Sequence, residues 1–193
     1  GTDKYYMWYS GSSDGKPWSV GLATASHPLG PWKKHASNPI IEGFGYVGGV
    51  VKKDSQYFMY NAHLIGSTGA DYSPLSMAVA DKAEGPWKLY DGNPVMKQGE
   101  WSEWDDGGIS EAEVLYHSGV FHLFYGGAKL FDVRRHTRES IGYAYSLDGY
   151  TFTKYGLNPV VTLTSNPNVG AFSEVHGIFE APFIYLYHTI RYK

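Results

Sequence analysis

Three glutamates are spaced so that their carboxyl groups could lie together. Glu111 lies 13 residues before Phe124, Glu174 lies 13 residues before Tyr187, and a serine precedes each glutamate. Glu113 follows two residues after Glu111, so a regular strand would carry both on one side. A protonated and an ionised carboxyl group can act together as general acid and general base. Like-charge repulsion between Glu111 and Glu113 would raise the pKa of one of them, as an acid catalyst requires.

Several other side chains are candidates for ligand binding: Asp106, Trp104, Arg134, Arg135, His176 and His188. Each has a structural alternative. Asp105 and Asp106 precede two glycines, which indicates a solvated turn, and a buried histidine can simply have its hydrogen bonds satisfied. The arginine-rich segment 131–138 is expected at the surface, although a loop folded over a ligand could bind a carboxylate or a phosphate through its guanidinium groups. Tryptophans in irregular segments could stack on a sugar ring.

The elements that must position these residues are short strands. The 193 residues include 17 Tyr, 6 Trp, 24 Gly and 10 Pro, a composition that favours many strands joined by tight turns. No stretch of more than about ten residues combines apolar positions at helical spacing with freedom from Gly and Pro. The sequence therefore predicts an all-β fold.

A set of sequence signals recurs along the chain. Residues 21–40, 76–95 and 141–160 each contain a strand-like segment, a turn and an Asn-Pro pair. An aromatic strand precedes each copy and another follows the last one, at residues 6–9, 57–60, 122–125 and 185–188. A unit of this size with about four short strands is typical of one blade of a β-propeller.

We therefore predict a β-propeller in a single domain over residues 1–193. The blade-like repeats are expected at about residues 5–45, 46–100 and 110–165, with the start of a fourth at 173–193. Known propellers have at least about four blades. A chain with about three to four blades is thus expected to be either part of a longer protein or a chain that completes its ring by self-association.

Nearly the whole chain resembles the five-bladed propeller glycoside hydrolases, the broad group of arabinanases, xylosidases and fructosidases. The most specific stretch is residues 104–116, which is followed by residues 119–127 and 141–149 and contains Glu111-Ala112. In the family an acidic residue followed by proline commonly stands here, on the innermost strand. The resemblance implies a base, an acid and a third acidic residue on successive blades. The base would precede the first aromatic strand, where this chain has no counterpart, and the second copy has Val47-Gly48-Gly49 without a carboxylate.

The resemblance implies hydrolysis of a glycosidic bond in a polysaccharide or oligosaccharide. Glu111 would be the principal acidic residue and Glu174 its partner. Glu180 stands in a similar Glu-Ala-Pro motif, but it lies too close to the strand that follows it. Two alternatives stay open: a non-catalytic carbohydrate-binding propeller, favoured by the missing base, and a glycoside phosphorylase that uses the segment 131–138.

Composition limits the other partners. The 16 Lys and Arg nearly balance the 19 Asp and Glu, so there is no basic field to hold nucleic acid or an anionic membrane. No apolar run approaches the roughly 18 to 20 residues of a membrane span, and a soluble protein, cytoplasmic or exported, is expected. With no cysteine and no metal-binding motif, no cofactor and no catalytic metal are expected to be required. A structural calcium or sodium ion on the propeller axis remains an option.

Overall fold

All regular structure among the described residues is β-strand. The computed structural model describes residues 4–13, 16–63, 74–129, 139–162 and 169–192. The described part of the chain contains no helix, and therefore none that could cross a membrane. The predicted all-β class is confirmed.

The strands form four antiparallel sheets in chain order. The first sheet contains β1 (Tyr5–Gly11), β2 (Ser19–Ala25) and β3 (Lys33–Lys34). The second contains β4 (Tyr46–Lys53), β5 (Gln56–His63), β6 (Ser76–Ala80) and β7 (Lys88–Leu89). The third contains β8 (Gly108–His117), β9 (Val120–Ala128), β10 (Glu139–Ser146) and β11 (Thr153–Lys154). The fourth is the hairpin of β12 (Val169–Glu180) and β13 (Phe183–Tyr192).

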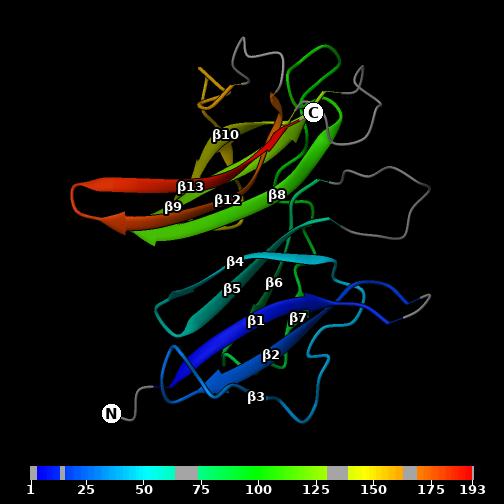
Figure 1. Cartoon of the computed structure of the whole chain (residues 1–193), viewed down its shortest axis with the longest axis vertical. Helices are drawn as coiled ribbons and strands as arrows, with labels where there is room; N and C mark the ends of the chain where they lie inside the picture. The colour runs from blue at the N-terminus through cyan, green and yellow to red at the C-terminus, as the bar shows by residue number, and fades with distance from the viewer. Residues whose placement is uncertain (1–3, 14–15, 64–73, 130–138, 163–168, 193) are drawn as a thin grey trace.

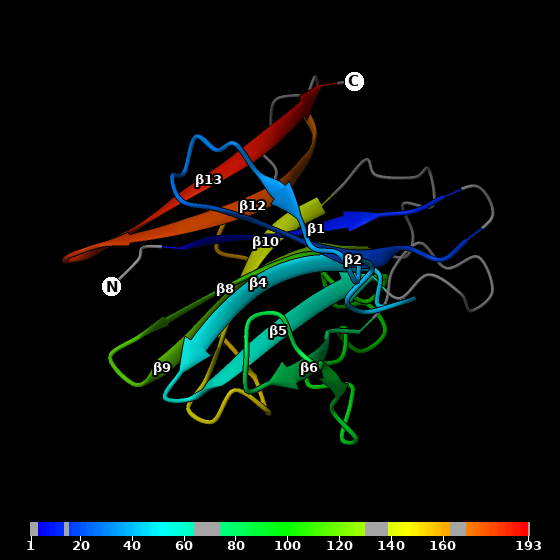
Figure 2. The ribbon, with the colours of Figure 1, turned by 90° about the horizontal axis from the view of Figure 1, so that it is seen from below.

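The sheets follow one another along the molecule. Figure 1 shows the succession from the β1–β3 sheet at the lower end to the β12–β13 hairpin near the upper end. The repeats predicted from the sequence form the last two strands of the first three sheets: β2 and β3, β6 and β7, and β10 and β11. The first strands of successive sheets meet, because β8 contacts β4 on one side and β12 on the other; β4 and β8 run side by side in Figure 2. We call β4, β8 and β12 the inner strands.

Apolar side chains fill the spaces between sheets. The cluster between the first two sheets contains Val20, Phe44, Met59 and Ala78, with Trp8 and Trp87 packed against it. The largest cluster joins the second and third sheets through residues such as Tyr60, Ile109, Phe121, Tyr125 and Phe152. Phe124, Ile141 and Val175 lie between the third sheet and the hairpin. Alternation along the strands produces this arrangement, since successive residues point to opposite faces.

In each of the three repeats, the asparagine of the Asn-Pro pair holds the end of a sheet. The side-chain amides of Asn38, Asn93 and Asn158 accept the backbone N–H and donate to the carbonyl of one residue, in β2, β6 and β10 respectively. Two hydrogen bonds to one residue hold the strand to the turn that follows it. We call this arrangement the asparagine clamp.

The pairing of β5 corrects one part of the sequence alignment. In β1 and β9 a tyrosine pairs with the first residue of the repeat, Gly21 or Gly142. In β5 the residue opposite Ser76, the matching position, is Asn61 and not Tyr60. The aromatic strand of the second copy is therefore displaced by one residue from the predicted register. Alignment by residue type selected the aromatic ring, whereas strand pairing fixes the position.

Candidate active site

β8 begins at a turn that requires glycine. Gly108 has a φ of +128°, a conformation that glycine adopts without strain. Its N–H donates to the carbonyl oxygen of Asp105 at 3.1 Å, and the N–H of Gly107 donates to the carbonyl oxygen of Ala128 at 2.9 Å. These bonds join the turn to the third sheet and start β8 three residues before Glu111.

The two faces of β8 carry different chemistry. Ala112 is buried in the core that β8 forms with the second sheet. Glu111 and Glu113 lie on the other face. That face meets β12, because a Cβ added at Gly177 of β12 would lie 2.9 Å from Cδ1 of Leu115. Both carboxyl groups therefore face the junction of the inner strands β8 and β12.

The carboxylate of Glu111 contacts the main chain of β12. Its Oε2 accepts a hydrogen bond from the backbone N–H of Glu174. Glu174 has a φ of +55°, which is uncommon for a residue other than glycine. It lies in a β-bulge between Ser173 and His176, and bulges re-aim the groups of a strand. The structure thus brings the two glutamates together through the side chain of one and the amide of the other.

The matching 13-residue offsets do not give Glu111 and Glu174 the same backbone conformation. In β8 the extra residue of the bulge is Ser110, and Glu111 pairs normally with Gly126. In β12 the extra residue falls after Ser173, so Glu174 itself lies in the bulge. A sequence offset alone cannot distinguish these two placements.

Glu113 forms an ion pair with His176. Its Oε1 lies 3.4 Å from Nδ1 of the imidazole, and the glutamate side chain is 15% exposed whereas that of the histidine is 62% exposed. Burial raises the pKa of Glu113 above its ordinary value of 4.5, and the nearby His176 opposes part of this change. Glu113 is therefore the carboxyl group of this junction whose surroundings favour holding a proton.

The inner strand β4 has no carboxyl group because its backbone lies directly against β8. A Cβ added at Gly48 would overlap the carbonyl oxygen of Ala112, and one added at Gly49 would overlap the backbone of Val114. Any side chain at these positions would push the two strands apart. The absence of an acidic residue from Val47-Gly48-Gly49 thus has a packing cause.

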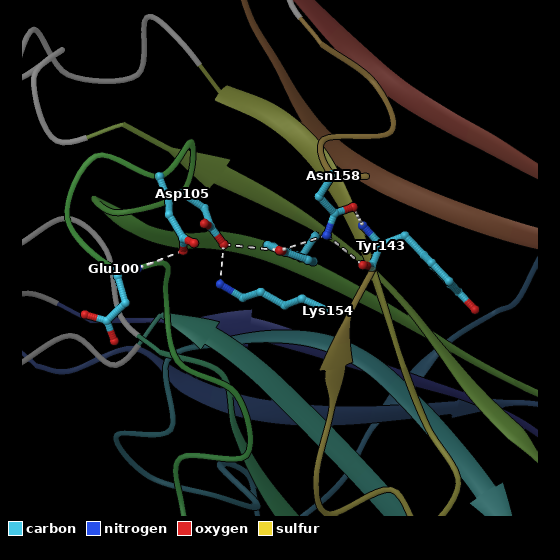
Figure 3. Close-up of polar contacts among 7 residues, drawn as sticks. Glu100, Asp105, Tyr143, Lys154 and Asn158 are labelled. Atoms are coloured by element: carbon cyan, nitrogen blue, oxygen red, sulfur yellow. Dashed lines mark hydrogen bonds and ion pairs between the residues drawn. The ribbon is translucent and has the colours of Figure 1, made fainter. Parts of the chain in front are cut away.

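Asp105 corrects the expectation of a solvated turn. The residue is 1% exposed, and its Oδ2 lies 2.6 Å from Nζ of Lys154 and accepts a hydrogen bond of 3.1 Å from the hydroxyl of Tyr125. Burial, followed by the charge of Asp105, raises the pKa of Tyr125, which keeps its hydroxyl protonated as a donor. Asn158 extends the network to Tyr143, as Figure 3 shows.

Trp104 packs against the third sheet. Its indole lies against the positions where Gly127 and Gly142 lack a side chain, and its ring centroid is 5.5 Å from that of Tyr125. The indole is half-buried, and stacking of Trp104 on a sugar stays a prediction. Glycines at neighbouring points of two strands are the sequence signal for a large side chain lying across them.

The remaining candidate residues belong to the turn before β8, to β13 and to the segment 131–138. Asp106 accepts a hydrogen bond of 2.9 Å from the N–H of Ser102 within the turn before β8. His188 lies half-buried on β13. Arg134 and Arg135, like the rest of the segment 131–138, lie outside the described residues.

Glu180 is placed far along β12 from the glutamate junction. It pairs with Phe183 beside the hairpin turn, whereas Glu174 lies six residues earlier in the same strand. Its side chain is exposed. Among the described residues, no group of three or more His, Asp or Glu side chains is arranged to hold a metal ion.

Comparison with known proteins gives no match to a sequence family and none to a curated protein. Solved structures do match. A family 117 glycoside hydrolase of the marine bacterium Zobellia galactanivorans aligns with 98% of this chain at 19% identity and a TM-score of 0.66. A family 32 β-fructofuranosidase of Bombyx mori aligns with 97% at 14% identity and a TM-score of 0.68. A thermostable family-43 glycoside hydrolase aligns with 97% at 17% identity and a TM-score of 0.67.

The chain has the fold of the five-bladed propeller glycoside hydrolases. The predicted fold class, an all-β propeller, is thereby confirmed. The chain spans 64%, 39% and 62% of the lengths of these three proteins. At identities below 20% the similarity establishes the fold of the propeller, while chemistry has to be argued from the site.

Proposed function

We propose that the chain contributes Glu111 and Glu113 to a site that hydrolyses a glycosidic bond in a polysaccharide or oligosaccharide. The observation that carries the proposal is the pair of carboxyl groups on one face of the inner strand β8, one of them buried and held toward its protonated form. Glycoside hydrolysis uses such a pair, one carboxyl protonating the leaving oxygen and the other acting as base or nucleophile. The glycoside hydrolase fold supports this assignment.

The surroundings suggest different roles for the two residues. Glu113 would be the acid, because burial raises its pKa, and the exposed imidazole of His176 lies 3.4 Å from its carboxyl group. Glu111 would be the ionised partner, with its Oε2 oriented by the amide of Glu174. Glu174 thus has a positioning role through its main chain.

The spacing of the two carboxyl groups favours inversion at the anomeric carbon. Residues two apart on a strand are separated by about 6.6 Å. Glu111 and Glu113 lie on one face of β8 at this spacing, with Glu111 in contact with Glu174 and Glu113 with His176. A separation of about 6.5 to 9.5 Å leaves room for a water molecule between carboxyl and sugar. NMR detection of the first-formed anomer tests this point.

The glycines of β4 favour a second candidate function, non-catalytic carbohydrate binding. Because Gly48 and Gly49 touch β8 directly, β4 offers no third carboxylate to the site. An aromatic pair could provide binding surface: the rings of Trp18 and Tyr46 lie 4.6 Å apart, and Tyr46, the first residue of β4, is 40% exposed. Asp106 and His188 are further candidates for sugar contacts. Phosphorolysis through Arg134 and Arg135 is the third candidate.

The test compares Glu111→Gln and Glu113→Gln with the control Glu180→Gln on a panel of aryl glycosides and oligosaccharides. Loss of acid or base catalysis should lower the rate by about 10² to 10⁴ in the two site variants. Glu180→Gln should leave the rate unchanged. Sugar affinity, measured by NMR titration, should change little, because glutamine keeps the size and hydrogen bonding of glutamate.

Other outcomes select between the candidates. Unchanged turnover in both site variants would contradict the catalytic assignment. Sugar binding without turnover in the unmodified chain, lost in Glu111→Gln, would identify a binding module. Turnover that needs added phosphate and disappears in Arg134→Ala would identify a phosphorylase.

A further inference from the structure

A groove of about 330 Å³ lies between the outer parts of the second and third sheets. One wall is β7 with the turn that follows it, and the other is the turn between β10 and β11. Both walls belong to four-stranded sheets. The lining residues are Val79, Lys88, Leu89, Tyr90, Asp91 and Tyr150. We call this feature the Tyr90 groove; its volume lies at the lower end of the range of about 300 to 1,000 Å³ that is usual for small-ligand sites.

Tyr150 is held in place from two sides. The Oδ1 atom of Asp148 accepts hydrogen bonds from the backbone N–H groups of Tyr150, at 2.8 Å, and Thr151, at 3.0 Å. The hydroxyl of Tyr150 donates to Oε1 of Gln56, the first residue of β5, at 3.0 Å. The second bond joins the third sheet to the second, so the groove is formed before any ligand arrives, as ligand sites usually are.

Two tyrosine rings provide the aromatic surface of the groove. The centroids of Tyr90 and Tyr150 lie 4.9 Å apart, and their planes are inclined at 53°. Gly92 makes room for the first ring, because a Cβ added there would lie 2.7 Å from Tyr90. Leu89, the next lining residue, is 54% exposed. Tyrosine combines an apolar ring with a polar hydroxyl, which suits a sugar, whose ring has C–H faces and hydroxyl edges.

An exposed ion pair borders these rings. Nζ of Lys88 lies 3.0 Å from Oδ2 of Asp91, and the two side chains are 73% and 85% exposed. Lysine supplies hydrogen-bond donors and aspartate supplies acceptors, so neighbouring hydroxyl groups of one ligand find both kinds of partner. The pair has no net charge and therefore favours neither an anion nor a cation. The groove thus fits a neutral, hydroxyl-rich ring.

The turn itself does not require Asp91. In all three repeats the N–H of the clamp asparagine donates to the carbonyl oxygen of the residue three positions earlier. Ala36 and Gly156 occupy the position of Asp91 in the first and third sheets, and the same turn forms there. The carboxylate beside the groove is therefore not explained by the folding of the turn.

We propose that the Tyr90 groove binds a sugar unit of a carbohydrate chain at a second site, separate from the candidate active site. β7 is three strands away from the inner strand β4, about 14 Å at the usual strand spacing. The groove is thus distant from the inner strand β8, which carries Glu111 and Glu113. The ligand class rests on the proposed function, since a polysaccharide or oligosaccharide is the substrate proposed there. A chain held at the groove has a raised effective concentration near the rest of the molecule.

The test is an NMR titration of the isotope-labelled full chain carrying Glu113→Gln, which suppresses hydrolysis, with arabino-, xylo- and fructo-oligosaccharides. At least one of these sugars should give saturable shifts of the backbone amides of Asp91 and Tyr150. Tyr90→Ala and Asp91→Ala, made in the same background, should weaken this binding at least about fivefold, as truncation of a contact residue does. Tyr90→Phe keeps the ring and should retain most of the affinity.

Tyr155→Ala is the matched control, because Tyr155 stands at the same turn position in the third sheet and is 43% exposed. It should leave binding at the groove unchanged. Melting temperatures verify that every variant folds.

The outcomes separate this inference from the proposed function. Shifts at Glu111 without shifts at the groove would overturn the inference and leave the proposed function standing. Shifts at the groove that are lost in Tyr90→Ala would support the inference, even if Glu111 showed none. The absence of groove shifts with all three kinds of oligosaccharide, or binding that survives both Tyr90→Ala and Asp91→Ala, would overturn it. Equal weakening by Tyr155→Ala would overturn it as well.

Discussion

Replacing Lys154 by methionine tests how far the buried carboxylate of Asp105 depends on one cation. Asp105 is 1% exposed and Lys154 is 27% exposed at the side chain, and their charged atoms lie 2.6 Å apart. Removing one partner of a buried ion pair costs about 3 to 5 kcal/mol, because the other charge is left without compensation. The partial exposure of Lys154 indicates the lower end, about 3 kcal/mol. For a chain of this size that loss lowers the melting temperature by about 6 to 12 °C.

The exposed pair of Lys88 and Asp91 provides the control. Its atoms are 3.0 Å apart, but the side chains are 73% and 85% exposed, and such pairs contribute about 0 to 1 kcal/mol. Lys88→Met should therefore change the free energy of unfolding much less than Lys154→Met. Urea denaturation monitored by tryptophan fluorescence measures both.

A double-mutant cycle separates the ion pair from simple loss of packing. In Asp105→Asn/Lys154→Met the buried charge is gone, while the hydroxyl of Tyr125 retains an acceptor. The double variant should be more stable than the sum of the single losses predicts, by at least about 1.5 kcal/mol. A coupling free energy near zero, or a cost of Lys154→Met no larger than that of Lys88→Met, would refute the reasoning.

Three further predictions concern other sites. Glu113→Gln should gain stability relative to the unmodified chain as the pH rises from about 4 to 7. The reason is that a folded-state pKa above 4.5 makes ionisation of Glu113 unfavourable to folding. A difference in the free energy of unfolding, measured by urea denaturation, that does not change with pH would contradict this. Gly48→Ala, whose Cβ would overlap Ala112, should cost about 1 to 3 kcal/mol, whereas Gly11→Ala, with no atom within 4 Å, should change stability by less than about 0.5 kcal/mol. Burial alone would raise the pKa of Asp148, but hydrogen bonds from the backbone and from a serine outweigh burial and hold that pKa below 3.8. Asp148→Ala should therefore lower the melting temperature more at about pH 6 than at about pH 3. Equal losses of melting temperature at the two pH values would argue against this.

The propeller could be predicted because its signals are local. An asparagine clamp joins residues only 15 or 16 positions apart, so its turn chemistry appears as a repeated motif in the sequence. The predicted register of β5 differs from the observed one by one residue. Alignment by residue type matched Tyr60 to the tyrosines of β1 and β9, whereas Asn61 has the matching pairing position. Residue type guided that alignment, whereas the true position depends on pairing with another strand.

The candidate site was predictable only in part. Glu111 and Glu113 could be recognised because a strand places alternate residues on one face. The burial of Asp105 could not, because it depends on Lys154, 49 residues away in the sequence. The contact of Glu174 with Glu111 depends on a bulge, which moves a backbone amide without changing the spacing of residues.

The asparagine clamp also bears on how such a chain can grow. Each clamp is complete within its own repeat, from β2, β6 or β10 to the turn after β3, β7 or β11. A duplicated segment would therefore keep these hydrogen bonds wherever it is inserted. Only its inner strand has to fit new neighbours, and there the sheets differ, with Gly48 in β4, Glu111 in β8 and Glu174 in β12. The same outer arrangement can therefore be repeated in successive sheets, while the side chains that differ in chemistry lie on the inner strands.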